Sequence, residues 1–209
     1  MLVITVARRG GRRGVDDVSP VIAAIGRRHR SRLTRGPEAM SLTSFRLLTD
    51  DPATALTIVL ELHRDEQWAV ALGIGTVESR PLPASLRDLH GDAVDAARAA
   101  ATALGRGTVR VRVRVHGDET ASADIDAILS LLLAHRDRRT ESGWELADLL
   151  GSGHSRGEAA ARLGVSASAV SQRASAAGLV LDAAAEQALA RLIAAADPDR
   201  ASASRSPQA

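Results

Sequence analysis

The sequence predicts an α+β fold in which a sheet with packed helices is followed by an all-α segment. Up to residue 117, apolar runs typical of strands alternate with amphipathic segments typical of helices. Beyond that point no strand-like run appears again. We therefore expect an α/β domain over 1–117, a connecting helix in 118–139, an all-α domain over 140–196 and a disordered tail over 197–209.

Four segments of the first half are predicted to be strands. The Val, Ile and Thr content of the third is typical of a strand, and its Gly73 and Gly75 suggest a bend or a close backbone approach. The fourth alternates Val with Arg, which predicts a half-buried strand whose Arg110, Arg112 and Arg114 share one face. The four strands are Leu2–Val6, Met40–Leu48, Trp68–Glu78 and Thr108–His116.

Helical spacing and cap residues predict the helices. Ser19 is expected to be an N-cap with Pro20 in the first turn, and Asp50 and Asp51 precede the next helix as cap candidates. The helices of the first half are expected over Ser19–Leu33, from Pro52 to Leu62, and over Asp92–Leu104. Those of the second half are expected over Asp124–Arg136, Glu141–Leu150, Arg156–Leu163, Ala167–Ala177 and Asp182–Ala196.

Composition excludes several kinds of chemistry. The 209 residues contain no Cys, Tyr or Lys, so all 27 basic residues are Arg. This excludes disulfides, Cys-ligated metals, thiol catalysis and a Schiff-base lysine. Net charge is only +2, yet residues 1–36 hold nine Arg and two Asp, which indicates a basic N-terminal patch. No apolar run approaches a transmembrane length, so we expect a cytoplasmic protein without a membrane partner.

The strongest functional pattern is a helix-turn-helix sequence in the second half. Ser155 and Glu158 predict a capping box at the start of its first helix. Gly164 falls where the turn needs a left-handed backbone, and Ser166 is the expected N-cap of the next helix. Val170 and Ala174 are four residues apart and are expected to face inward.

The remaining side chains of the second helix predict an outward face of short polar groups. Such a face can enter the major groove and bind base edges and phosphates of double-stranded DNA. Residues 140–196 hold four Arg and six acidic residues, so binding would need a homodimer or help from the basic N-terminal region. A protein-binding or purely structural hairpin stays an alternative. The predicted DNA contacts are Ser155, Ser166, Ser168, Ser171, Gln172 and Arg173.

Two further basic features are candidate anion sites. The first is a Gly-rich loop in which glycine allows close approach of phosphate and Arg supplies paired donors. The second is the Arg110, Arg112 and Arg114 stripe, which can contact DNA, a nucleotide or an acidic partner such as residues 118–126. Each feature has the alternative of being a solvated surface. The candidate phosphate-binding residues of the loop are Arg8, Arg9, Arg12 and Arg13.

Several motifs carry a resemblance to known families. The helix-turn-helix is similar to sigma-factor region four and to LuxR-type regulators. Over most of its length the chain resembles the SatD family, which combines a ferredoxin-like, nucleotidyl-cyclase-like sheet domain with a helix-turn-helix domain. The matching pieces are Ile4–Arg13, Gly73-Ile74-Gly75, Gly91-Asp92-Ala93, Ala96-Ala97-Arg98 and Ala169-Val170-Ser171-Gln172-Arg173.

The resemblance also implies where a cyclase would hold magnesium. Acidic ligands would stand after the first strand and in a hairpin, because Mg²⁺ at a triphosphate requires hard carboxylate oxygens. This chain has Ala7 at the first place and Thr43 and Ser44 at the second. We therefore expect a non-catalytic domain that needs no metal or cofactor and serves assembly or sensing.

These observations favour a DNA-binding transcriptional regulator. A nucleotide-binding domain related to cyclases, or an adaptor that docks proteins through the helix-turn-helix, remain the alternative hypotheses.

Overall fold

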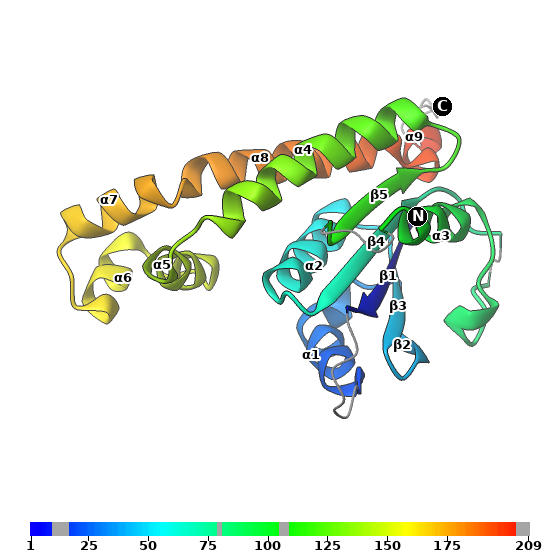
Figure 1. Ribbon diagram of the computed structural model, residues 1–209, viewed down its shortest axis with the longest axis horizontal. Helices are drawn as coiled ribbons and strands as arrows, with labels where there is room; N and C mark the ends of the chain where they lie inside the picture. The colour runs from blue at the N-terminus through cyan, green and yellow to red at the C-terminus, as the bar shows by residue number, and fades with distance from the viewer. Residues whose placement is uncertain (10–16, 79–80, 105–108, 204–209) are drawn as a thin grey trace, which may run out of the picture. The chain divides into compact units, whose positions relative to one another are not determined.

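A computed structural model describes residues 1–9, 17–78, 81–104 and 109–203 (Figure 1). It is an α+β structure with one five-stranded mixed sheet. The chain divides into two compact units. The sheet unit comprises Met1–Ser130 and Leu189–Ala209, and the helical unit comprises Leu131–Ala188.

The limits of these units differ from those expected at residues 117, 140 and 196. Both boundaries fall inside long helices, α4 (Glu119–Asp137) and α8 (Leu179–Ala196). A change of composition marks where strands cease, but a continuous helix can belong to one compact unit at its start and to another at its end.

The strand order is β2-β3-β1-β4-β5. All neighbouring pairs are antiparallel except β4 and β5, which are parallel and joined through helix α3 (Asp92–Leu104). A parallel pair needs a crossover of this kind. The strands are β1 (Leu2–Arg8), β2 (Arg35–Ser41), β3 (Ser44–Thr49), β4 (Trp68–Ile74) and β5 (Val111–Val115).

The other helices follow the predicted order. The sheet unit also contains α1 (Ser19–His29), α2 (Pro52–Arg64), α9 (Pro198–Ala203) and short 3₁₀ turns at Arg30–Arg32 and Leu86–Asp88. The helical unit contains α5 (Glu141–Gly151), α6 (Arg156–Leu163) and α7 (Ala167–Ala176), together with the end of α4 and the start of α8.

The predicted single strand over Met40–Leu48 is wrong, because this region is a hairpin. Strand β2 ends at Ser41, the chain turns at Leu42 and Thr43, and β3 begins at Ser44. The side chain of Leu42 is 81% exposed in this turn, and the hydroxyls of Ser41 and Ser44 are 2.7 Å apart. The turn contains neither Gly nor Asn, so the usual hairpin signal was missing from the sequence.

Two capping predictions have different outcomes. The carboxylate of Asp51 accepts hydrogen bonds from the backbone N–H groups of Ala53 and Thr54, which confirms it as the N-cap of α2. Ser19 is not the N-cap of α1, since Val18 occupies that position and Ser19 lies inside the helix. The hydroxyl of Ser19 instead donates to Asp17 at 2.6 Å.

Helices α4 and α8 begin earlier than predicted. Helix α4 starts at Glu119, where Asp118 accepts a hydrogen bond from the backbone N–H of Ala121. Helix α8 starts directly after Gly178, whose φ of +61° breaks the preceding helix. The first turn of α4 consists of polar and small residues, which give no apolar period. The start of α8 has three consecutive aliphatic residues, Leu179, Val180 and Leu181, which do not follow helical spacing.

The sheet core is aliphatic, as composition requires. Helix α3 packs so closely on β4 that a Cβ at Gly73 would lie 2.2 Å from the carbonyl oxygen of Ala93, which confirms the predicted close backbone approach. Val111, Val113 and Val115 are buried as expected, whereas Val109 is 36% exposed and precedes β5.

The segment expected to be a disordered tail has structure up to residue 203. Pro198–Ala203 form α9, and Asp197 is buried. The Met1 amino group donates to the carboxylate of Asp197 at 2.6 Å and to the carbonyl of Gly75 at 2.9 Å. Within the described residues, no helix has the length and apolar character needed to span a bilayer.

Candidate functional site

Helix α6 begins at the predicted capping box. The backbone N–H of Ser155 donates to the Glu158 carboxylate at 2.7 Å, and the backbone N–H of Glu158 donates to the Ser155 hydroxyl at 3.2 Å. These bonds lower the pKa of Glu158, so its negative charge persists at the positive end of α6. The start of α6 is therefore fixed by local chemistry.

The turn between α6 and α7 also has its predicted form. Gly164 adopts the left-handed conformation with φ of +63°, and the backbone N–H of Val165 donates back to the carbonyl of Ala160. The hydroxyl of Ser166 accepts a hydrogen bond from the backbone N–H of Ala169 at 3.2 Å and so caps α7. Glycine is required here because a side chain raises the energy of this conformation.

A small apolar cluster joins α5, α6 and α7. Leu146 of α5, Ala159 of α6 and Val170 of α7 are fully buried in it. Alanines at the contact let the helices approach closely, and Leu149, Leu150, Leu163, Val165 and Leu179 close the periphery. The inward prediction for Val170 and Ala174 is confirmed, and it fixes which face of α7 points outward.

The outward face of α7 holds the predicted contact residues. Ser168, Ser171 and Gln172 are exposed, and Arg173 is half-buried. In the described part of the chain, neither Gln172 nor Arg173 forms a hydrogen bond through its side chain. The Ser171 hydroxyl donates to the carbonyl of Ala167 at 3.1 Å, so it presents its oxygen as an acceptor. Ser155 and Ser166 are exposed but serve as N-caps.

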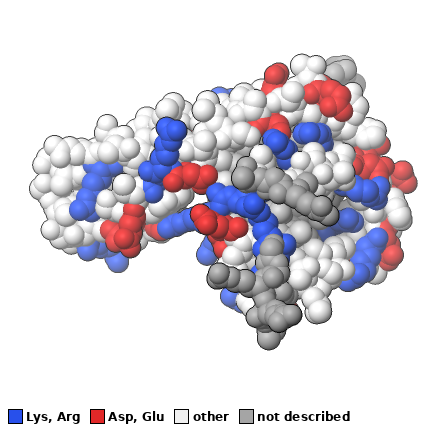
Figure 2. All heavy atoms as spheres, viewed as in Figure 1, with Lys and Arg blue, Asp and Glu red and all other residues white. Residues whose placement is uncertain are grey.

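Charge on this unit is mixed. The helical unit contains six Arg and seven acidic residues. Arg156, Arg162 and Arg173 lie on α6 and α7, where Glu158 is the one acidic residue. Figure 2 shows basic and acidic side chains interspersed over the face in view rather than gathered into one extended basic patch. Attraction of DNA by charge alone is therefore weak.

Sequence reasoning missed an ion cluster within the helical unit. Arg136 of α4 binds the Asp182 carboxylate with two nitrogens, at 2.9 and 2.7 Å, and also pairs with Glu186. Arg139 pairs with Asp182 at 3.1 Å and lies 4.5 Å from the ring centre of Trp144. Each ion pair joins residues more than 40 positions apart in the sequence, so no local sequence pattern indicates the cluster.

A hollow of about 710 Å³ was also missed. It lies on the helical unit, and its apolar part includes Val180 and Leu181, which are 73% and 69% exposed. Arg156 and Ser171 contribute polar groups to the same hollow. Because α8 was predicted to start at Asp182, the two exposed aliphatic residues were not assigned to a helix surface.

The two places at which the cyclase resemblance implies metal ligands are brought together. Ala7 of β1 and Ser44 of β3 are cross-strand partners, and the backbone N–H of Arg8 donates to the carbonyl of Thr43 at 2.8 Å. A methyl and two hydroxyls therefore stand where that resemblance implies carboxylates. Among the residues that the structure describes, no cluster of three His, Asp or Glu is arranged to hold a metal.

The Gly/Arg loop is only partly described. The side chains of Arg8 and Arg9 are half-buried, and the backbone N–H of Arg9 donates to the carbonyl of Gln67 at 2.7 Å. Arg12 and Arg13, the other predicted phosphate ligands, lie outside the described residues.

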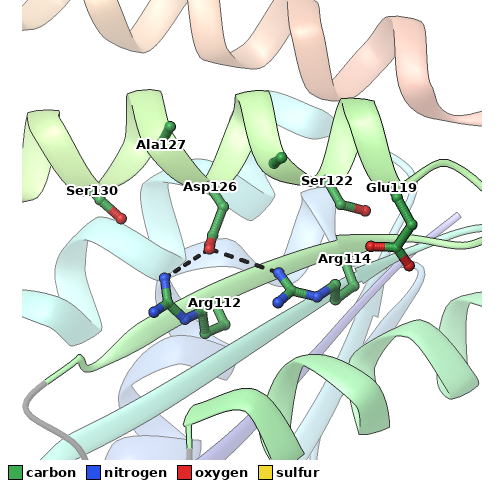
Figure 3. A pocket seen from close by; sticks show the side chains of 8 residues that line it. Arg112, Arg114, Glu119, Ser122, Asp126, Ala127 and Ser130 are labelled. Atoms are coloured by element: carbon green, nitrogen blue, oxygen red, sulfur yellow. Dashed lines mark hydrogen bonds and ion pairs between the residues drawn. The ribbon is translucent and has the colours of Figure 1, made fainter.

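The arginine stripe separates into two parts. Arg110 binds the His63 ring at 3.1 Å. Arg112 and Arg114 of β5 both point toward Asp126 of α4, at 2.7 and 3.7 Å (Figure 3). The acidic segment 118–126 does contact the stripe, as one of the alternatives anticipated.

Comparison of the chain with protein-family models, with curated proteins and with solved structures finds no match.

Proposed function

We propose that the helical unit binds double-stranded DNA, with α6 and α7 acting as a helix-turn-helix and α7 as the recognition helix. The observation that carries the proposal is the outward face of α7. Its opposite face is fixed by burial of Val170 and Ala174, which leaves Ser168, Ser171 and Gln172 exposed on a capped, regular helix. A recognition helix reads base edges through side-chain hydrogen bonds, which hydroxyl and amide groups can form.

Individual roles follow from side-chain chemistry. Gln172 has a donor and an acceptor on one amide, which suits paired hydrogen bonds to adenine. Arg173 supplies a guanidinium for a phosphate or a guanine edge, and its half-buried stem limits how far it can move. Ser168 and Ser171 support these contacts through their hydroxyls, and Ser155 and Ser166 lie near the helix starts where backbone N–H groups attract phosphate.

The mixed charge of the unit favours a binding mode with two copies. A single α7 with weak phosphate attraction would give low affinity, whereas a dimer doubles the contacts on a palindromic site. We therefore propose a homodimer on DNA, with half-sites about one helical turn apart.

We infer further that the sheet unit is non-catalytic. The order β2-β3-β1-β4, with every pair antiparallel, is the order of a ferredoxin-like sheet, and this supports the resemblance to nucleotidyl cyclases and the SatD family. The pairing of Ala7 with Ser44 supports loss of the cyclase metal site. The whole chain would then be a transcription regulator whose sheet unit serves assembly or sensing.

Selection of genomic fragments by the purified full-length protein, sequenced at two salt concentrations, tests DNA binding. Enrichment of one motif, and of a palindrome in particular, is the expected result. Anisotropy titrations on that motif then compare Gln172→Ala and Arg173→Ala with the wild type. We expect each variant to bind about tenfold or more weakly, and Arg173→Ala to reduce the salt dependence of binding.

Arg138→Ala is the matched control, because Arg138 is exposed in the turn that follows α4 and is far from α7 in sequence. It removes the same charge as Arg173→Ala, so a purely electrostatic effect would weaken both variants alike. No enrichment at either salt concentration, or equal affinity of wild type and both α7 variants, would rule out the proposal.

A further inference from the structure

We infer that Arg112 and Arg114 form a binding site for a small molecule that carries one carboxylate or phosphate group. The site is a hollow of about 350 Å³ between β5 and the first turns of α4 (Figure 3). All of its lining residues belong to the sheet unit. The inference is independent of DNA binding by α7.

The two guanidiniums are held side by side by the fold. Arg112 and Arg114 are alternate residues of one strand, so both project from the same face of the sheet. In register they lie beside Ala71 and Gly73 of β4, which have almost no side chain to cover them. Each arginine is 27% exposed, so both are partly desolvated yet open to a ligand.

Asp126 positions the two arginines but leaves some of their N–H donors unused. One carboxylate oxygen accepts from Nη1 of Arg112 at 2.7 Å and lies 3.7 Å from Nη1 of Arg114. The other oxygen accepts from the backbone N–H of Val113 at 3.0 Å. The carboxylate is thus committed to the strand, while the second terminal nitrogen of each guanidinium points away from it (Figure 3).

Unused guanidinium donors are the feature that indicates an oxyanion. A guanidinium carries five N–H donors in a plane and binds carboxylate or phosphate through two at once. Arg112 and Arg114 share the one carboxylate of Asp126. Among the described residues, their one other acceptor is the carbonyl of Val113, which accepts a hydrogen bond from Arg114. Two fixed, partly buried cations with open donors favour an anionic group in the hollow.

The rim limits the charge of the ligand. Glu119 also lines the hollow, is exposed, and forms no ion pair with either arginine. Its carboxylate would repel a polyphosphate more than a single anionic group. The volume lies near the lower end for ligand pockets, which also favours a small molecule over a nucleoside triphosphate or a duplex backbone.

Titration of the full-length protein, followed by the ¹⁵N shifts of arginine Nε–Hε groups at constant ionic strength, tests the site. The probes are orthophosphate, acetate and a nucleoside triphosphate. We expect saturable shifts of Arg112 and Arg114 with orthophosphate or acetate and weaker binding of the triphosphate. Arg112→Gln and Arg114→Gln should each weaken binding about tenfold, because each removes a charge-assisted contact.

Two further variants make the result decisive. Asp126→Asn keeps an acceptor for Val113 but removes the competing charge, so it should tighten binding several-fold. Arg98→Gln removes an arginine that is 68% exposed on α3 and should change nothing. Absence of saturable shifts in both wild type and Asp126→Asn, equal affinity in Arg112→Gln, or a response of these arginines to duplex DNA alone would overturn the inference.

Discussion

Ala7 of β1 lies directly opposite Ser44 of β3 across an antiparallel strand pair. Side chains at such positions are about 5 Å apart at Cβ, which is the spacing at which two carboxylates can share a cation. In the sequence, only the resemblance to cyclases suggested that these two positions lie close together. Two acidic side chains placed at these positions would therefore be close enough to bind one cation together.

Acidic residues introduced at both positions should create a cation site. In Ala7→Asp/Ser44→Asp, two like charges face each other across the strands, and we expect a loss of up to about 1 kcal/mol of stability at neutral pH without metal. Mg²⁺ or Mn²⁺ should reverse this loss and raise Tm, whereas the wild type should show no such increase. Thermal unfolding with and without each ion measures the effect, and Ala7→Asn/Ser44→Asn is the uncharged control.

The turn of the proposed helix-turn-helix gives a matched pair of glycine variants. Gly164→Ala places a side chain at φ of +63° and should destabilise the helical unit by about 1–2 kcal/mol. Gly157→Ala lies in the first turn of α6, where the Ser155 hydroxyl oxygen is 3.9 Å from the new Cβ, and should stabilise the unit by about 0.5–1 kcal/mol. Amide exchange at Val170 and Ala174 reports the local stability, and opposite signs are the expected outcome.

The ion cluster should give the helical unit a defined acid sensitivity. Burial by itself raises the pKa of Asp182, but the hydrogen bonds and charges of Arg136 and Arg139 outweigh it and hold the pKa below its ordinary value. Stability from this group is therefore fully present above the unfolded pKa of about 4 and is lost as pH falls through the lower folded pKa. Asp182→Asn should lose about 3–5 kcal/mol at neutral pH and flatten this acid limb in urea unfolding.

Glu186 serves as the contrasting partner in the same cluster. Burial raises the pKa of Glu186, with Arg136 opposing and Asp182 reinforcing the rise, so its charged form is disfavoured in the fold. Glu186→Gln should therefore cost far less stability at neutral pH than Asp182→Asn. Equal losses for the two variants would contradict this division of roles.

The contact of α3 with β4 should tolerate no side chain at Gly73. In Gly73→Ala the new Cβ would meet backbone atoms of Ala93 and Ala97 at 2.2 Å, so the helix must move away from the strand. We expect a loss of about 3 kcal/mol or more and reduced yield of folded protein. Gly36→Ala, with no atom within 4 Å of the added Cβ, should leave the unfolding midpoint nearly unchanged.

Local chemistry made the helical segments of the candidate site predictable. Ser155, Glu158, Gly164 and Ser166 each act on backbone groups within four residues, so their caps and turn can be deduced without knowledge of the fold. The β2–β3 hairpin was not predictable in this way, since its turn at Leu42 and Thr43 has no special backbone requirement.

Long-range pairing decided the remaining features. The alternation of Val and Arg determined by itself that Arg112 and Arg114 share a face, because strand geometry has a period of two. Only the tertiary structure decided that Asp126 would lie between them, and that Ala7 would face Ser44. Periodicity and caps are properties of neighbouring residues, whereas strand order and helix packing depend on how the whole chain buries its apolar surface.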